Sequence, residues 1–226
     1  MKDIHGKAIF DYHQGIRDQK LLIHNNYDQP EEMPIDVFFR PKIDFTELEA
    51  IAIESCKGTI LDLGAGAGAH SLPLQQIGFD VTALENSTAC CKTLERRGVN
   101  KIVKENYQNH QAKYDTILCL MNGLGIAGKI DLIPAFLKKC MSLLKKDGQL
   151  LIDSSDIHYL YKNVEKPNHY YGEVRYQYEY RGEKGHWFDW VYADQKTLKN
   201  LVEKIGLHME ILFVEDSDQY LARISN

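Results

Sequence analysis

The 226-residue sequence lacks any apolar run that approaches the roughly eighteen residues needed to span a membrane. It also lacks an apolar signal region near its start, so we expect a cytoplasmic protein without a membrane partner. Low-complexity segments and internal repeats are absent, and the 44% hydrophobic content suffices for one core. We therefore expect a single domain over residues 1–226.

The sequence has few cysteines and more acidic than basic residues. The five cysteines are odd in number and show no Cys-x-x-Cys spacing, which argues against a disulfide framework and against a metal site. We expect them to be reduced thiols that pack as small apolar groups. The formal net charge of −5 argues against a nucleic-acid partner, because phosphates favour a basic surface.

The most informative segment that is present is a three-glycine turn between an expected strand and an expected helix. Residues 59–63 form an apolar strand, Gly64, Gly66 and Gly68 follow it, and His70 opens the helix. Glycine allows positive φ and lets a ligand approach the backbone, while the first N–H groups of a helix are free donors. The turn therefore indicates a site for a nucleotide-like ligand, although the glycines also satisfy the loose dinucleotide pattern.

Two acidic residues favour one ligand over the other. Asp62 ends the strand two residues before Gly64, where its charge would repel a pyrophosphate and attract the sulfonium and ammonium groups of S-adenosylmethionine. Glu85 ends the next expected strand, residues 80–85, about twenty residues after the turn, which is the spacing at which an acid accepts hydrogen bonds from a ribose. The pair favours S-adenosylmethionine over NAD.

The run Leu61-Asp62-Leu63-Gly64-Ala65-Gly66-Ala67-Gly68, followed by Glu85, resembles motifs one and two of the class I S-adenosylmethionine-dependent methyltransferases. Residues 143–152 are similar to the helix, turn and fifth strand of that family. The resemblance extends from about residue 58 to 153, and more loosely from 194 to 224. It implies an enzyme that transfers a methyl group by direct displacement, a reaction that needs positioning more than a dedicated nucleophile.

The remaining elements agree with an α/β, Rossmann-like methyltransferase fold. Further strands are expected at 99–104 and 114–120, and helices at 70–76, 88–97, 133–144 and 195–205. Strands 208–214 and 219–224 are joined by a turn so tight that they must be antiparallel. We expect a mostly parallel seven-stranded sheet with an antiparallel last strand, in which 58–153 is the cofactor-binding core and 194–226 the C-terminal helix and strand pair.

Two segments lie outside this core. Residues 1–57 are expected to form a cap that is helical in parts. The insertion 154–193 holds eight of the thirteen tyrosines and both tryptophans. Within it, 173–180 alternates, 181–185 supplies a turn and 186–192 returns, which predicts a β-hairpin. Exposed aromatic patches mark interaction sites, so this hairpin is either a lid over the substrate or the interface of a homodimer.

The resemblance implies a set of cofactor-binding residues. They are Asp62, Gly64, Ala65, Gly66, Gly68, His70, Glu85, Asn86, Glu105, Asn106, Tyr107 and Met121. Either Glu105 or Asn106 would bind the adenine amino group, with Tyr107 beside them as an adenine contact. His70 would either contact the carboxylate of the cofactor or merely cap its helix.

Two residues are weak candidates for catalytic roles. Asn122 either orients the acceptor or caps a loop, and His158 either acts as a general base or is structural. We expect a small-molecule acceptor, whose identity the sequence does not give. A non-catalytic S-adenosylmethionine-binding or methyltransferase-like interaction subunit is an alternative. An NAD-dependent oxidoreductase is disfavoured by Asp62, by the antiparallel tail and by the lack of a Tyr-x-x-x-Lys set.

Overall fold

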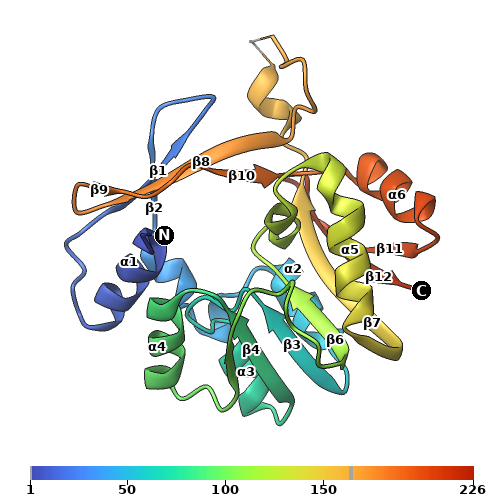
Figure 1. The fold of residues 1–226 in the computed structure, drawn as a ribbon, viewed down its shortest axis with the longest axis horizontal. Coiled ribbons are helices and arrows are strands. Elements are labelled where there is room, and N and C mark those ends of the chain that lie inside the picture. The colour runs from blue at the N-terminus through green and yellow to red at the C-terminus, as the bar shows by residue number, and fades with distance from the viewer. Residues whose placement is uncertain (1, 163–164) are drawn as a thin grey trace. The chain divides into compact units, whose positions relative to one another are not determined.

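The computed structural model describes residues 2–162 and 165–226 (Figure 1). The chain consists of two compact units. The first comprises Met1–Phe45, Thr59–His110 and Arg175–Phe188, and the second comprises Thr46–Gly58, Gln111–Val174 and Asp189–Asn226. Within the described ranges, no helix has both the length and the apolar character needed to cross a membrane.

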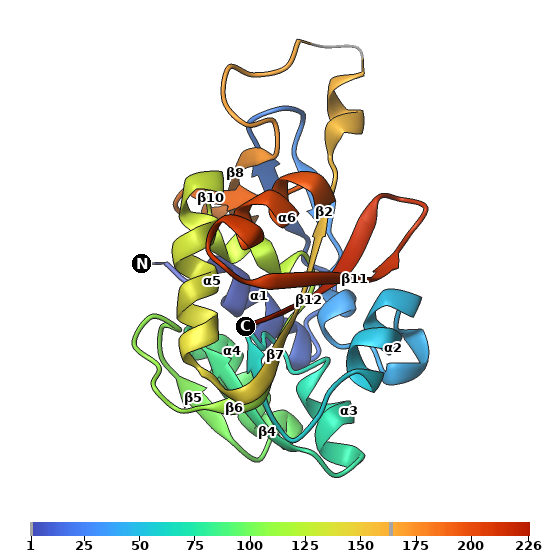
Figure 2. The same cartoon turned by 90° about the vertical axis from the view of Figure 1, so that its right-hand side faces the viewer.

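Seven strands form the main sheet in the order β11-β12-β7-β6-β3-β4-β5. Strands β3, β4 and β5 run parallel, β7 is parallel to β6, and β12 is antiparallel to both β7 and β11. Figure 2 shows β11 and β12 in red beside the yellow β7. The predicted α/β sheet with one reversed strand is therefore confirmed. The strands are β3 (Thr59–Leu63), β4 (Asp80–Glu85), β5 (Ile102–Lys104), β6 (Tyr114–Cys119), β7 (Leu144–Ser155), β11 (His208–Val214) and β12 (Gln219–Ser225).

The helices of the first unit begin and end where local sequence signals place them. Helix α4 (Thr88–Arg97) starts after Ser87, whose side chain accepts from the N–H of Cys90, and ends at Gly98 in a left-handed conformation. Helix α3 (Ser71–Gln76) follows the glycine turn. Helix α1 (Ile4–His13) packs against α4, and a shared core cluster includes Ala67 of the glycine turn.

A second, smaller sheet contains the predicted hairpin. Strand β8 (Glu173–Tyr180) turns through Arg181 and Gly182, both with positive φ, into the short β9 (Glu183–Lys184). The predicted hairpin is therefore confirmed, but its turn consists of two residues rather than 181–185, because Glu183 and Lys184 already pair with β8. The returning chain is interrupted before β10 (Phe188–Val191). Strand β8 also pairs with β1 (Leu21–Asn25), which pairs with β2 (Glu31–Met33).

The tyrosines of β8 do not form the exposed patch that the sequence suggests. Tyr180 is 1% exposed and Tyr176 is 8% exposed, and Tyr180 shares a core cluster with Ile4 and Ile9 of α1. The expectation of an exposed aromatic face is therefore wrong for these residues, because Tyr180 packs against α1, while the Tyr176 ring lies beside those of Tyr27 and Phe188.

Residues 1–57 contain strands as well as the expected helices. Besides α1 and α2 (Glu47–Glu54), this segment supplies β1, β2 and two short 3-10 helices, η1 (Ile35–Phe38) and η2 (Lys42–Asp44). A capping box between Thr46 and Glu49 begins α2. The five cysteines of the chain are buried free thiols, in agreement with the packing role expected for them.

The second unit departs from the prediction at the start of β7. Helix α5 (Ile133–Ser142) is shorter than expected, and β7 begins at Leu144, before the expected turn at Asp147. The register moves from Tyr114↔Leu144 to Thr116↔Gln149, so the turn is a bulge inside a longer strand. Helix α6 (Gln195–Lys204) begins as predicted, with the Asp194 side chain accepting from the N–H of Thr197 at 2.9 Å. The remaining short helices are η3 (Gly123–Ala127), η4 (Ile130–Leu132) and η5 (His158–Tyr161).

Candidate cofactor and reaction site

The glycines of the turn differ in what surrounds them. At Gly66, which has a φ of 55°, the nearest described heavy atom to an added Cβ is the carbonyl oxygen of Gly64 at 3.9 Å. At Gly68, which has a φ of 84°, the same atom would lie 2.8 Å from Leu94 Cδ2. Gly66 therefore faces open space, whereas Gly68 is needed for the packing of the turn on α4.

Glu85 at the end of β4 connects the turn to the start of α4. Its Oε2 accepts from the N–H of Gly66 at 2.9 Å, and its Oε1 accepts from the N–H groups of Asn86 and Ser87, both at 2.8 Å. Burial raises the pKa of the Glu85 carboxyl, and these three N–H groups act in the opposite direction. A carboxylate has about four lone-pair sites, so one acceptor position remains beside Gly66.

Asp62 lies deeper in β3 than a residue at the mouth of a site. It is 3% exposed, and its Oδ2 accepts from Ser71 Oγ at 2.5 Å. Burial raises the pKa of the Asp62 carboxyl, while the charge of His70 and the hydrogen bonds of Ser71 lower it. The carboxylate thus fixes the first residue of α3.

His70 is buried at the start of α3, with its ring centroid 5.4 Å from that of Phe45. In the part of the chain that the structure describes, its side chain makes no capping hydrogen bond to the helix. His70 thus occupies the N-cap position of α3 without a side-chain capping bond.

The segment after β5 holds the three candidate adenine contacts. The Glu105 carboxylate is hydrogen-bonded to Nδ1 of the His110 ring, which is 5% exposed. Asn106 Oδ1 accepts from the N–H of Gln108 at 2.9 Å, and the carbonyl of Tyr107 accepts from the N–H of His110 at 3.2 Å. The sequence did not indicate the contact between His110 and Glu105, because no spacing pattern couples the two residues.

In the second unit, the chain that leaves β6 adopts a strained turn. Met121 and Asn122 are consecutive non-glycine residues with φ of 66° and 57°. Asp153, which is 1% exposed, accepts from the N–H of Asn122 at 2.9 Å and from that of Gly123 at 2.8 Å. A buried carboxylate therefore holds this turn, a role that the sequence did not indicate.

The side chain of Asn122 is fixed as well. Ser155 Oγ donates to Asn122 Oδ1 at 2.7 Å, and Gln219 Nε2 donates to the Oδ2 of Asp153 at 2.7 Å. Asn122 occupies the N-cap position of η3, but among the described residues its side chain makes no capping bond to that helix. Held by Ser155 through its oxygen, the amide has its Nδ2 donor available for another group.

His158 occupies a different setting. It is exposed on η5, and its ring centroid lies 5.7 Å from that of Tyr171. Its main-chain N–H donates to Asp156 Oδ1 at 2.9 Å. The ring is thus less firmly fixed than the amide of Asn122.

Comparison with known proteins decides the family. Residues 39–210 match the family model described as a methyltransferase domain. An S-adenosylmethionine-dependent methyltransferase from Bacteroides fragilis, solved with S-adenosyl-L-homocysteine, is 35% identical, with a TM-score of 0.92 over 99% of this chain and 94% of the other. This chain belongs to the S-adenosylmethionine-dependent methyltransferases. Its cofactor is S-adenosylmethionine.

More distant structures share the fold of this methyltransferase. The CcbJ methyltransferase from Streptomyces caelestis is 16% identical, with a TM-score of 0.63 over 83% of this chain and 91% of the other. CalS10 from Micromonospora echinaspora, an amino pentose methyltransferase, is 14% identical, with a TM-score of 0.54 over 79% and 88%. No curated protein matches the sequence.

Proposed function

We propose that this methyltransferase transfers the methyl group to a small-molecule acceptor by direct displacement. The net charge of −5 disfavours nucleic acid as the acceptor. The fold is compatible with such acceptors, since the amino pentose methyltransferase CalS10 has it. The cofactor supplies the activated methyl group, so the chain has to position the acceptor and exclude water.

The open space at Gly66 beside the Glu85 carboxylate carries the assignment of the cofactor site. We assign the ribose to Glu85, which keeps one acceptor position on the oxygen that binds the N–H of Gly66. Gly64, Ala65 and Gly66 would offer their backbone, and Asn86 would flank the ribose. Gly68 supports the turn through its packing rather than through a contact with the cofactor.

Asp62 and His70 would act on the amino-acid part of the cofactor. The negative charge of Asp62 favours the ammonium group, and its hydrogen bond from Ser71 keeps the start of α3 in place. His70, which makes no side-chain capping bond to α3, would contact the cofactor carboxylate.

For adenine we favour Glu105 over Asn106. The adenine amino group is a donor and needs an acceptor, and the Asn106 oxygen, which accepts from Gln108, keeps only one lone pair. The Glu105 carboxylate is fixed by His110 and keeps a further oxygen. Tyr107 would contact the adenine ring.

We assign acceptor positioning to Asn122. Its amide orientation is set by Ser155, and its backbone by Asp153, so the Nδ2 donor is preorganised for an oxygen or lone pair of the acceptor. His158 remains the weaker candidate, because its exposed ring is not fixed at a defined position.

A transfer assay tests the proposal. The purified chain is incubated with methyl-labelled S-adenosylmethionine and metabolite pools, and label is measured in the fraction that passes an ultrafilter. We expect label in this small-molecule fraction with the parent and none with Gly66→Val. Label confined to protein or nucleic acid would contradict a small-molecule acceptor.

A further inference from the structure

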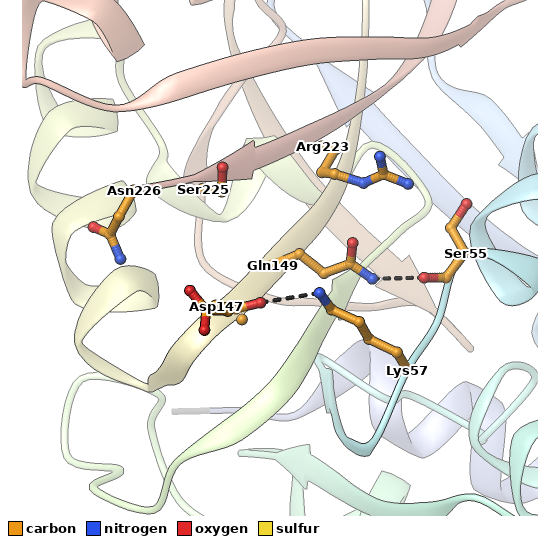
Figure 3. Close-up of a pocket in the computed structure, with 8 residues that line it drawn as sticks. Ser55, Lys57, Asp147, Gln149, Arg223, Ser225 and Asn226 are labelled. Atoms are coloured by element: carbon orange, nitrogen blue, oxygen red, sulfur yellow. Dashed lines mark hydrogen bonds between the residues drawn. The ribbon is translucent and has the colours of Figure 1, made fainter.

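A polar cavity of about 450 Å³ lies within the second unit, at the start of β7 and the end of β12. It is at the opposite end of β7 from Asp153, and none of the residues assigned to the cofactor or acceptor line it. Its volume falls in the range of about 300–1,000 Å³ typical of small-molecule sites. We call it the β7–β12 pocket, and its lining residues are Ser55, Lys57, Asp147, Gly148, Gln149, Arg223, Ser225 and Asn226 (Figure 3).

Arg223, which lines this pocket, carries a buried donor without a hydrogen-bond partner among the described residues. Its Nη1 donates to Glu210 Oε2 at 2.8 Å in a cross-strand pair with β11. Its Nε is buried and, among the described residues, has no hydrogen-bond partner. A buried unpaired N–H costs about 1–3 kcal/mol, so native proteins rarely leave one without water or a ligand. The guanidinium edge that carries Nε is also the edge that binds carboxylate and phosphate groups through two parallel hydrogen bonds.

Lys57 supplies a second cation. Its Nζ donates to the main-chain oxygen of Asp147 at 2.9 Å, which holds the ammonium at the pocket. Figure 3 shows this bond, and it shows the Asp147 carboxylate turned away from Lys57. The main-chain oxygen accepts one ammonium proton, so Lys57 keeps further donors for a ligand.

Gln149 gives the pocket a rigid frame between the two cations (Figure 3). It is 5% exposed, and its Nε2 donates to the main-chain oxygen of Ser55 at 2.5 Å and to Thr116 Oγ1 at 3.3 Å. The bulge at Asp147 and Gly148 shapes the same wall. Lys57 and Arg223 thus bring two cations to a lining that also includes Asp147, and Arg223 is paired with Glu210, so an anion would be held on the side of the two cations.

We propose that the β7–β12 pocket binds a small organic oxyanion, a carboxylate or a phosphate ester, between the Nε edge of Arg223 and the ammonium of Lys57. This inference does not rest on the proposed acceptor. It assigns the enzyme a second ligand site, remote along β7 from the turn held by Asp153.

The test follows the Nε–H resonance of Arg223 in ¹H–¹⁵N spectra, assigned by its loss in Arg223→Lys. Inorganic phosphate and citrate are the two probes, titrated separately at constant ionic strength with sodium chloride. We expect a saturable shift with at least one probe, and the stronger probe distinguishes phosphate from carboxylate recognition. Lys57→Met should weaken the apparent affinity about tenfold or more, the effect of losing one charged hydrogen bond.

Lys138→Met on the exposed face of α5 is the matched control, because it removes the same charge outside the pocket. It should bind the probe with parental affinity. A linear shift, or equal affinity in Lys57→Met and Lys138→Met, would reveal general charge screening and overturn the proposal. The absence of any shift would also overturn the proposal, because the Nε–H would then be hydrogen-bonded to water. If Lys57→Met does not fold, Arg223→Lys replaces it, because this variant keeps the charge and loses the Nε edge. The rise in Tm that the probe causes is then measured in Arg223→Lys and in the parent. An equal rise in both would contradict the proposal.

Discussion

Replacing Asp153 by asparagine should destabilise the enzyme, because it weakens the turn at Met121 and Asn122. In the parent, the two carboxylate oxygens accept the N–H groups of Asn122 and Gly123, and Gln219 donates to one of them. Asparagine keeps one acceptor oxygen and places an NH₂ group against the other N–H. The variant therefore loses a charged hydrogen bond, and its NH₂ group faces a main-chain N–H donor at a site only 1% exposed. Met121 and Asn122, which have positive φ, also lose support.

The expected loss is about 3 kcal/mol of unfolding free energy, since charged hydrogen bonds contribute about 1.5–3 kcal/mol and an unsatisfied buried donor adds to this. For a chain of this size that corresponds to a decrease of about 6–12 °C in Tm, measurable by calorimetry. Ser155→Ala is the matched control, because it removes one neutral hydrogen bond to Asn122 and should cost only about 1 kcal/mol. If Asp153→Asn unfolds within about 0.5 kcal/mol of the parent, the carboxylate does not hold the turn.

Three further outcomes are expected. Glu85→Ala should weaken S-adenosylhomocysteine binding by about 1.5–3 kcal/mol in calorimetry, with partial recovery in Glu85→Gln; parental affinity in Glu85→Ala would remove Glu85 from the ribose. Burial raises the pKa of Asp62, so the folded state binds more protons and its stability falls as pH rises above the unfolded value of 3.8. Asp62→Asn should therefore unfold no more easily than the parent at pH 7 while binding the cofactor more weakly, and a marked loss of stability in denaturant titrations would contradict this. Replacing residues 173–191 by a short Gly/Ser linker should unfold the first unit, because Tyr180 is buried and β1 loses a partner strand; a parental Tm would show that the hairpin is only peripheral.

The elements that the sequence predicts well are those defined by neighbouring residues. Helix α4 is bounded by its Ser87 cap and by Gly98, and the tight turn before β12 determines that strand's direction. The hairpin at Arg181 follows from alternation and a glycine. In each case the deciding contacts lie within a few residues of one another, so a local pattern contains them.

The features that the sequence missed depend on residues far apart. Pairing of β8 with β1 joins residues about 150 positions apart, and it converts an expected exposed tyrosine face into core. Asp153 meets the turn at Asn122 only because β7 lies beside β6. His110 reaches Glu105 through an irregular loop, and the bulge at Asp147 arises from a register change between strands. No local periodicity carries this information.

Binding of S-adenosylhomocysteine to Gly66→Val, measured by titration calorimetry, tests the cofactor assignment most directly. Gly78→Val is the control, because Gly78 also has a positive φ, 97°, and no described atom lies within 4 Å of its added Cβ. Both variants should retain the parental circular dichroism spectrum. We expect the parent and Gly78→Val to bind the ligand, and Gly66→Val to show no binding, because valine fills the space beside Glu85. A folded Gly66→Val that binds with parental affinity would place the cofactor elsewhere.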